Sequence, residues 1–163
     1  MGVKDYYNSI SKGYDSLYRG EQEKKWKAIR GYIRVKRKKV LEVGCGTGII
    51  TEKLKRASRL VAVDISEKMI EIAKSKGIKA EFLVADAENL PFEDKEFDIV
   101  ISITMLQDLK NPLKAIEEMK RVGKKVIFSL MAKGKKAEKV RKKYGKGMVA
   151  GKDEFWILED KNE

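Results

Sequence analysis

The sequence Leu41-Glu42-Val43-Gly44-Cys45-Gly46-Thr47-Gly48 decides the fold, because it joins an apolar strand pattern to three closely spaced glycines. Its first residues, with Val40 before them, favour a β-strand. Glycine has no Cβ and adopts positive φ easily, so a ligand can approach the backbone of such a turn closely. Ile49, Ile50 and Leu54 follow at helical spacing. The stretch therefore predicts a strand, a nucleotide-binding turn and a helix whose free amide groups face the turn.

Two acidic residues near this turn restrict the ligand. Asp64 ends the next apolar run, about 20 residues after Gly44, where a Rossmann-like fold places an acid on ribose hydroxyls. This position suits NAD and S-adenosylmethionine equally. Glu42, two residues before the first glycine, would repel a pyrophosphate and attract the ammonium group of a methionine moiety. The glycine spacing G-x-G-x-G also differs from the G-x-G-x-x-G pattern of dinucleotide sites.

These residues resemble motif I of the class I S-adenosylmethionine-dependent methyltransferases, which is close to E-x-G-x-G-x-G. Glu42, Gly44, Gly46 and Gly48 match that motif. The resemblance implies S-adenosyl-L-methionine as the cofactor. It also implies an α/β fold, a three-layer Rossmann-like sandwich with a mostly parallel sheet of six or seven strands and helices on both faces. An ordinary α/β protein with a glycine turn and a chance acid is the alternative.

The resemblance extends to the residues after the next strand, which is predicted over 80–85. In the family, an acid there hydrogen-bonds the adenine amino group and the next residue's backbone meets the ring. The resemblance assigns these roles to Asp86 and Ala87, although Asp86 could instead cap the following turn. The candidate cofactor-binding residues are Tyr14, Glu42, Gly44, Cys45, Gly46, Thr47, Gly48, Asp64, Ile65, Asp86 and Ala87.

Other local patterns predict the remaining core. Apolar runs predict strands over 60–63, 97–103 and 124–130. Ser66 and Asn111 precede helical patterns as expected N-caps. Phe155-Trp156-Ile157-Leu158 predicts an edge strand, paired as a hairpin with residues 147–150.

Tyrosines mark the start of the chain. Tyr6, Tyr7, Tyr14 and Tyr18 lie among polar residues, which predicts one or two short helices over the domain. This segment resembles one that small-molecule and quinone-biosynthesis methyltransferases fold across the cofactor. The tyrosines would stack on the ligand, shape the entrance or anchor the segment on the core.

A second amphipathic helix is predicted over 21–34, before the first strand, from apolar residues at helical spacing. The length supports one domain with a sizeable core. We expect residues 1–163 to form that domain, with 1–35 as a helical segment over the cofactor and acceptor site and 36–163 as the Rossmann-like core.

The methyl acceptor is expected at the end of strand 97–103. Methyl transfer is an in-line displacement at a sulfonium carbon, so the protein mainly positions donor and nucleophile and excludes water. The sequence has no histidine, which leaves Asp, Glu, Tyr, Lys or a backbone carbonyl as any base. The candidate catalytic residues are Asp108, Gln107 and Thr104. Covalent attack on a pyrimidine ring is disfavoured because the only cysteine, Cys45, lies in the cofactor turn.

The amino-acid composition restricts which metal ligands the protein can offer and where in the cell we expect it. No histidine and one cysteine exclude a Cys/His metal site and an internal disulfide, so no metal is expected. No apolar run approaches the ~20 residues of a membrane span, and the start lacks a signal-peptide core. We therefore expect a cytoplasmic protein that does not engage a membrane, and favour a monomer. Abundant Lys and Glu point to a heat-adapted (thermophile) source.

A net charge of +12 and a pI of about 9.6 point to a polyanionic partner. The basic run 36–39 precedes the first strand and so faces away from the strand ends that bind ligands. The run 131–146 starts at the carboxyl edge and is the candidate for holding a phosphate backbone; a solvated helix face is the alternative.

Charge and motif together predict methyl transfer to a base in RNA, either rRNA or tRNA. The two isolated prolines leave no Pro-Pro motif of the kind found in many amino-group nucleic-acid methyltransferases, which disfavours an exocyclic amine as acceptor. A protein-lysine or small-molecule methyltransferase, a nicotinamide oxidoreductase and an inactive nucleotide- or RNA-binding module are the alternatives.

Overall fold

The structure, a computed structural model, describes residues 2–161, which form a seven-stranded sheet in the order β3-β2-β1-β4-β5-β7-β6. The first five strands are parallel, and β7 runs antiparallel to both of its neighbours. The strands are β1 (Lys39–Val43), β2 (Arg59–Asp64), β3 (Glu81–Val84), β4 (Phe97–Ser102), β5 (Gly123–Met131), β6 (Met148–Ala150) and β7 (Asp153–Glu159). The predicted mostly parallel sheet is confirmed.

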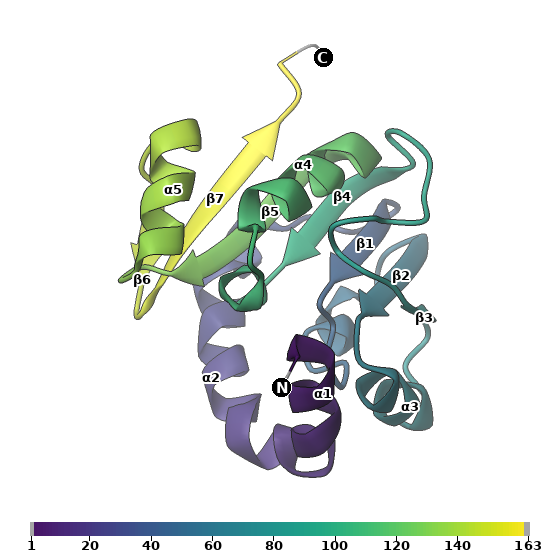
Figure 1. The fold of residues 1–163 in the computed structure, drawn as a ribbon. Helices are drawn as coiled ribbons and strands as arrows, with labels where there is room; N and C mark the ends of the chain where they lie inside the picture. The colour runs from purple at the N-terminus through teal and green to yellow at the C-terminus, as the bar shows by residue number, and fades with distance from the viewer. Residues whose placement is uncertain (1, 162–163) are drawn as a thin grey trace.

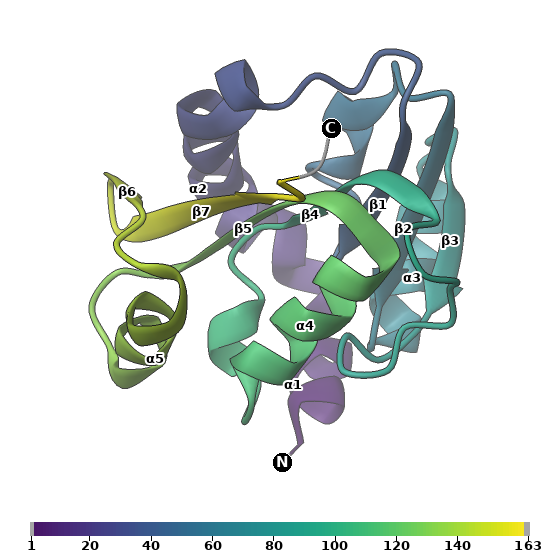
Figure 2. The same cartoon turned by 90° about the horizontal axis from the view of Figure 1, so that it is seen from above.

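Helices cover both faces of this sheet (Figures 1 and 2). They are α1 (Val3–Ile10), α2 (Tyr14–Ile29), α3 (Glu67–Ser75), α4 (Pro112–Val122) and α5 (Lys135–Tyr144), with short 3-10 helices η1 (Ser11–Gly13), η2 (Arg30–Tyr32), η3 (Thr51–Leu54) and η4 (Leu106–Asp108). Successive side chains of β2 point to opposite faces of the sheet and so show which helices cover each face. Val61 and Val63 belong to the same buried cluster as residues of α4, whereas Leu60 belongs to the cluster that includes Ile29 of α2, and Ala62 to the one that includes Ile70 of α3. The predicted three-layer sandwich is confirmed.

Two predicted helix starts are confirmed by their caps. Ser66 Oγ accepts a hydrogen bond from the backbone N–H of Met69 at 3.2 Å, at the start of α3. Asn111 Oδ1 accepts one from Lys114 N–H at 3.2 Å, and Pro112 occupies the first turn of α4. Each cap satisfies an amide that the helix itself leaves unpaired.

The predicted helix after the glycine turn is wrong. Turns and the short η3 occupy this segment, where Gly48 C=O accepts from Glu52 N–H at 3.1 Å and Ile50 C=O from Lys53 N–H at 2.9 Å. Fifteen residues, 44–58, join β1 to β2, and the first five form the turn, in which Gly44, Gly46 and Gly48 have positive φ values that a right-handed helix does not use.

Two predicted boundaries also differ. The helix expected over 21–34 is α2, which begins at Tyr14 and gives way to η2 at Arg30. Gly20 lies inside it on the exposed side and does not interrupt it. The predicted C-terminal hairpin forms, but β7 lies between β5 and β6, so β6 is the edge strand. Phe128 of β5 and Trp156 of β7 stack with ring centroids 5.4 Å apart, which favours this pairing.

The helix α1 lies over the carboxyl ends of the central strands (Figure 1). In Figure 1, α1 lies at the arrowhead ends of β1, β2 and β4, where ligands bind in open α/β sheets. Within residues 2–161 there is no helix of the length and apolarity that crossing a bilayer requires. The same part of the chain holds no cluster of three or more His, Cys, Asp or Glu side chains suited to a metal ion.

Candidate active site

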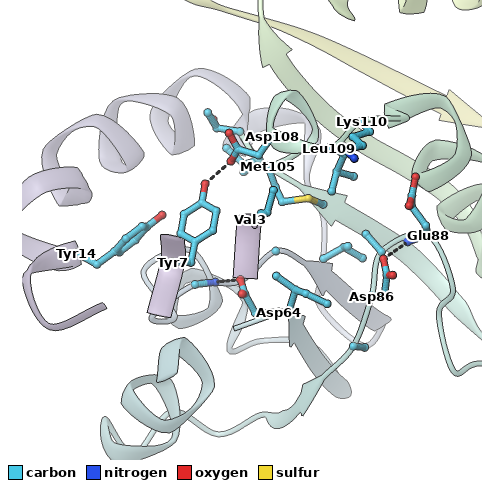
Figure 3. A pocket seen from close by; sticks show the side chains of 18 residues that line it. Val3, Tyr7, Tyr14, Asp64, Asp86, Glu88, Met105, Asp108, Leu109 and Lys110 are labelled. Carbon is cyan, nitrogen blue, oxygen red and sulfur yellow. Dashed lines mark hydrogen bonds between the residues drawn. The ribbon is translucent and has the colours of Figure 1, made fainter. Parts of the chain in front are cut away.

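A cavity of about 280 Å³ lies between α1 and the carboxyl ends of β1, β2 and β4 (Figure 3). Its floor includes Gly44 and Gly46 of the glycine turn and Asp64 of β2. Tyr7 and Tyr14 cover one side. The opposite side is formed by the segment 104–110, called the acceptor loop below, which contributes Thr104, Met105, Asp108, Leu109 and Lys110. Residues from five parts of the sequence thus enclose a space of small-ligand size.

The glycine turn is shaped by what packs on it. Gly44 has φ +79°, and a Cβ there would lie 2.5 Å from Cγ of Met105. Gly46 has φ +54°, and a Cβ there would lie 3.4 Å from the ring of Tyr14. Backbone N–H groups of Gly44 and Cys45 donate to Val63 C=O at 2.8 and 3.0 Å. The turn is therefore fixed on β2 with bare backbone facing the cavity.

Asp64 joins the turn to the start of α3. Its Oδ2 accepts from Gly46 N–H at 2.8 Å, and its Oδ1 accepts from Ser66 N–H at 2.9 Å. Burial raises the pKa of Asp64, and these backbone donors oppose that rise. Each carboxylate oxygen keeps a further lone pair for a ligand hydroxyl, and Asp64 lines the cavity.

Glu42 lies behind the turn and does not line this cavity. It is 4% exposed, and Thr51 Oγ1 donates to its Oε2 at 2.5 Å. Burial raises the pKa of Glu42 to about 8. A carboxyl that is protonated at neutral pH attracts an ammonium group only after it loses that proton, so the predicted attraction requires proton release on binding.

The other turn residues support the site from within the protein. Cys45, Thr47 and Gly48 are buried and lie outside the cavity lining. Thr47 donates a hydrogen bond to Asp15 of α2, which joins that helix to the turn. Their predicted contacts with a cofactor stay predictions.

The predicted adenine side lies at the end of β3. Ile65, Asp86 and Ala87 line the cavity. Asp86 Oδ1 accepts from Glu88 N–H at 2.9 Å, and Asp86 C=O accepts from Asn89 N–H at 3.0 Å. Asp86 therefore caps the following turn, the alternative foreseen from sequence, and also faces the cavity (Figure 3).

The candidate catalytic residues differ in their surroundings. Asp108 lines the cavity and accepts a hydrogen bond from the Tyr7 phenol (Figure 3). Gln107 does not line it, because its Nε2 donates to Thr104 C=O at 2.7 Å. Thr104 lines the cavity, but its hydroxyl is hydrogen-bonded to Lys25 and Asp153. The structure brings Asp108 and Thr104 to one cavity and turns the Gln107 amide toward its own loop.

Sequence reasoning did not single out several lining residues. Tyr7 was one of four tyrosines without a distinguishing pattern, and its partner Asp108 is 101 residues away. Burial and Asp108 raise the pKa of Tyr7, so the phenol remains a proton donor at neutral pH. Met105 lies between the predicted residues Thr104 and Gln107, and Leu109 and Lys110 follow Asp108; their position in the loop was the available signal.

The basic run 131–146 contains α5, which lies next to the acceptor loop. The amine of Lys136 donates a hydrogen bond to Gln107 C=O. Arg141 and Lys143 pair with Glu154 and Glu117. The lysines of this run that are exposed and have no ion-pair partner among residues 2–161 are Lys133, Lys135, Lys139, Lys142 and Lys146.

Comparison with known proteins places this site in a family. Residues 41–126, more than half of the chain, match the family described as "Methyltransferase domain". A demethylmenaquinone methyltransferase of Thermotoga maritima is 31% identical over 137 residues, covering 77% of this chain and 60% of that protein. A "Probable tRNA methyltransferase 9B" of Bos taurus is 32% identical over 125 residues, covering 74% and 26%.

A solved structure shows the same fold with a cofactor present. The magnesium protoporphyrin IX methyltransferase of Synechocystis with bound S-adenosylmethionine superimposes with a TM-score of 0.75 at 19% identity, covering 97% of this chain and 95% of that one. The chain spans about half to three fifths of the length of the first curated relatives that it matches. The glycine turn, the fold and the family match together place this chain in the class I S-adenosylmethionine-dependent methyltransferases.

Proposed function

We propose that this chain transfers a methyl group from S-adenosylmethionine to a base in RNA, either rRNA or tRNA. The observation that carries the proposal is the contact of Lys136 with Gln107, which sets the start of the basic helix α5 beside the acceptor loop. Lys110 of the same loop lines the cavity and is exposed. A phosphate backbone lying along these lysines would bring a neighbouring base to the cavity mouth.

The charges of α5 support this orientation. Lys135, Lys139 and Lys142 follow one another at i, i+4 and i+7, so they form one exposed stripe along the helix. No acidic side chain among residues 2–161 pairs with them, whereas Lys143 pairs with Glu117. Unpaired lysines gain more from phosphate contact than paired ones, because they leave no acidic partner behind.

The cavity suits the cofactor in three respects. Gly44 and Gly46 line the cavity with main-chain atoms only, and the absence of a Cβ lets Met105 and Tyr14 pack against the turn. Asp64 would accept from ribose hydroxyls, and Asp86 with Ala87 would meet the adenine. When bound, S-adenosylmethionine supplies a methyl group on a positively charged sulfur. The chain's own task is then to orient an acceptor and to exclude water.

The N-terminal segment has a proposed part in this task. α1 is held over the cavity by Lys4, whose amine pairs with Glu67 at 2.8 Å, and by Tyr7, which binds Asp108. We propose that residues 1–35 act as a cover on a core formed by 36–163. Asp108 is the proposed base or orienting acceptor for the nucleophile, and Tyr7 holds it in place.

The test is to give the purified chain tritiated S-adenosylmethionine with extracts of a strain that lacks its gene. Label should pass into the RNA fraction and be released as methylated nucleosides after nuclease digestion. Label confined to the protein fraction would replace RNA with a protein acceptor such as lysine. An Asp64→Ala variant is the matched control, because weaker cofactor binding should lower labelling of every fraction by the same factor at a cofactor concentration below saturation.

A second candidate acceptor is a small apolar metabolite, and the cavity lining favours it. Val3 of α1, with Met105 and Leu109 of the acceptor loop, presents apolar surface on the acceptor side. One relative carries the name demethylmenaquinone methyltransferase. In the same experiment this candidate predicts label in the organic extract, with the RNA fraction unlabelled.

A further inference from the structure

Thr104 has an unusual backbone conformation at the point where β4 leads into the acceptor loop. Its φ is +58°, in the left-handed region that β-branched residues rarely adopt. A residue of this kind keeps such a conformation only where surrounding contacts impose it. The contacts of Thr104 therefore show what holds the loop.

All three polar groups of Thr104 are engaged. Its backbone N–H donates to Ser129 Oγ at 2.9 Å, and its C=O accepts from Gln107 Nε2 at 2.7 Å. Its hydroxyl accepts from Lys25 Nζ at 2.6 Å and donates to Asp153 Oδ2 at 2.8 Å. Four parts of the chain, α2, β5, β7 and η4, thus converge on one residue.

Lys25 and Asp153 form the charged part of this network. Their Nζ and Oδ2 atoms are 3.5 Å apart, and the residues are 8% and 1% exposed. Ser129 Oγ also donates to the same Oδ2 at 3.0 Å. A buried ion pair is a costly way to stabilise a fold compared with apolar side chains, which favours a role in fixing one conformation.

The conformation of Thr104 sets the direction of the residues after it. Met105 packs on the glycine turn, with its Cγ 2.5 Å from where a Cβ of Gly44 would be. Three residues later, Asp108 reaches the phenol of Tyr7 across the cavity. A change of backbone angle at Thr104 would move both groups, since they follow it directly in the chain.

We propose that the Lys25–Asp153 pair is a positioning device for methyl transfer, which locks Thr104 in its left-handed conformation and thereby holds the acceptor loop against the glycine turn. Thr104 is then a positioning residue, and its hydroxyl does not act on the acceptor. The catalytic part of this inference rests on the proposed function. The order of the loop can be measured without any acceptor.

The test compares amide hydrogen exchange of peptides covering residues 103–110 in three variants. Thr104→Val removes the hydroxyl and keeps the branched shape, and Thr104→Ser keeps the hydroxyl. The double variant Lys25→Met with Asp153→Leu removes both charges, so that neither is left buried alone. Exchange in 103–110 should rise roughly tenfold in Thr104→Val and in the double variant, and stay near wild type in Thr104→Ser.

Glu154→Gln is the matched control, because Glu154 follows Asp153 on β7, is 0% exposed and pairs with Arg141 of α5. It should speed exchange around residues 141–147 more than in 103–110. Unchanged exchange in 103–110 in both Thr104→Val and the double variant would overturn the proposal. A rise spread evenly over all strands would also overturn it, because that result indicates general stability only.

Measurements of kcat in the same variants distinguish a failure of this proposal from a failure of the proposed function. Where label passes into an acceptor fraction, Thr104→Val and the double variant should each lower kcat, and the triple variant should lose no more than either. Losses that multiply in the triple variant would show that the pair does not act through Thr104. If no fraction accepts label, the proposed function fails, and the exchange result still decides whether the pair orders the loop.

Discussion

The Tyr7 phenol donates a hydrogen bond to the Asp108 carboxylate, so that the first helix of the chain is joined to the acceptor loop across the cavity. The two residues are 101 positions apart in sequence. Their contact fixes one carboxylate oxygen of Asp108 and leaves the other side of the carboxylate for a ligand. It also means that α1 must remain in place for the loop to keep this arrangement.

Replacing Tyr7 with Phe should slow methyl transfer and leave cofactor affinity nearly unchanged. The lost hydrogen bond to a charged group is worth about 1.5–3 kcal/mol, so kcat should fall between about tenfold and a hundredfold if the bond contributes its full strength only in the transition state. Steady-state kinetics with the acceptor fraction and calorimetry with S-adenosylhomocysteine measure the two effects. Tyr32→Phe, at an exposed tyrosine of η2, is the matched control. An equal loss of affinity in Tyr7→Phe would contradict this assignment.

Asp108→Asn should also act on turnover alone. The amide keeps the shape of the carboxylate but cannot accept a proton, so kcat should fall by about 10²–10⁴-fold if Asp108 is a general base. Gln107→Ala should have a smaller effect, because the Gln107 amide binds Thr104 C=O within the loop. The measurement is the rate at saturating cofactor. Activity of Asp108→Asn close to wild type would remove Asp108 from the list of bases.

Asp64→Ala should weaken binding of S-adenosylhomocysteine by about 1–3 kcal/mol, the cost of leaving hydrogen-bonding groups unpaired. Part of that loss reflects the turn itself, since Asp64 also accepts from Gly46 and Ser66. Calorimetry with S-adenosylhomocysteine and with NAD measures both ligands. Asp160→Ala, at an exposed position beyond β7, is the control. NAD binding tighter than S-adenosylhomocysteine would contradict the assignment of the cavity.

The raised pKa of Glu42 predicts how the free energy of unfolding depends on pH. Burial raises its pKa to about 8 in the folded protein, above the value of about 4.3 for an exposed glutamate. The folded state therefore binds the proton of Glu42 more tightly than the unfolded state does. The free energy of unfolding that this proton contributes is fully present below about pH 4 and is lost as the pH rises toward 8. Asp64, whose pKa is also raised by burial, acts in the same direction.

Glu42→Gln, which is neutral at every pH, should remove most of this decline, on the order of a few kcal/mol between about pH 5 and pH 8. Urea unfolding across that range measures it. Glu138→Gln, at an exposed position on α5, should leave the slope unchanged. A Glu42→Gln variant with the wild-type slope would show that Glu42 titrates normally in the folded protein.

Local sequence patterns predicted the parts of this fold that depend on neighbouring residues. The strands follow apolar runs, and the caps at Ser66 and Asn111 follow from their positions before helical patterns. The motif that includes Gly44 likewise predicted the turn under the cavity. In each case, the residues that determine the structure lie within a few positions of one another.

Contacts between distant segments could not be predicted in this way. Lys25 and Asp153 each look like ordinary surface charges in sequence, and only the packing of α2 against β7 buries them together. The residues after the glycine turn have apolar positions at helical spacing and still form turns and η3, so periodicity alone did not decide their structure. The place of β7 inside the sheet depends on the stacking of Phe128 with Trp156.

The most direct test of RNA as the acceptor compares two charge-matched variants in binding RNA from the gene-deficient strain. One is Lys135→Gln, Lys139→Gln and Lys142→Gln on α5, and the other is Lys36→Gln, Lys38→Gln and Lys39→Gln at the amino end of β1. Each phosphate contact that is lost should flatten the slope of log affinity against log salt by about 0.7–0.9.

We expect the α5 variant to flatten this slope by about 2 units or more and to lose methyl transfer into RNA, with S-adenosylhomocysteine affinity unchanged. The variant at the amino end of β1 should change the slope much less, because it lies at the edge of the sheet opposite the cavity. If the β1 variant loses RNA binding and the α5 variant keeps it, the placement of RNA along α5 is wrong.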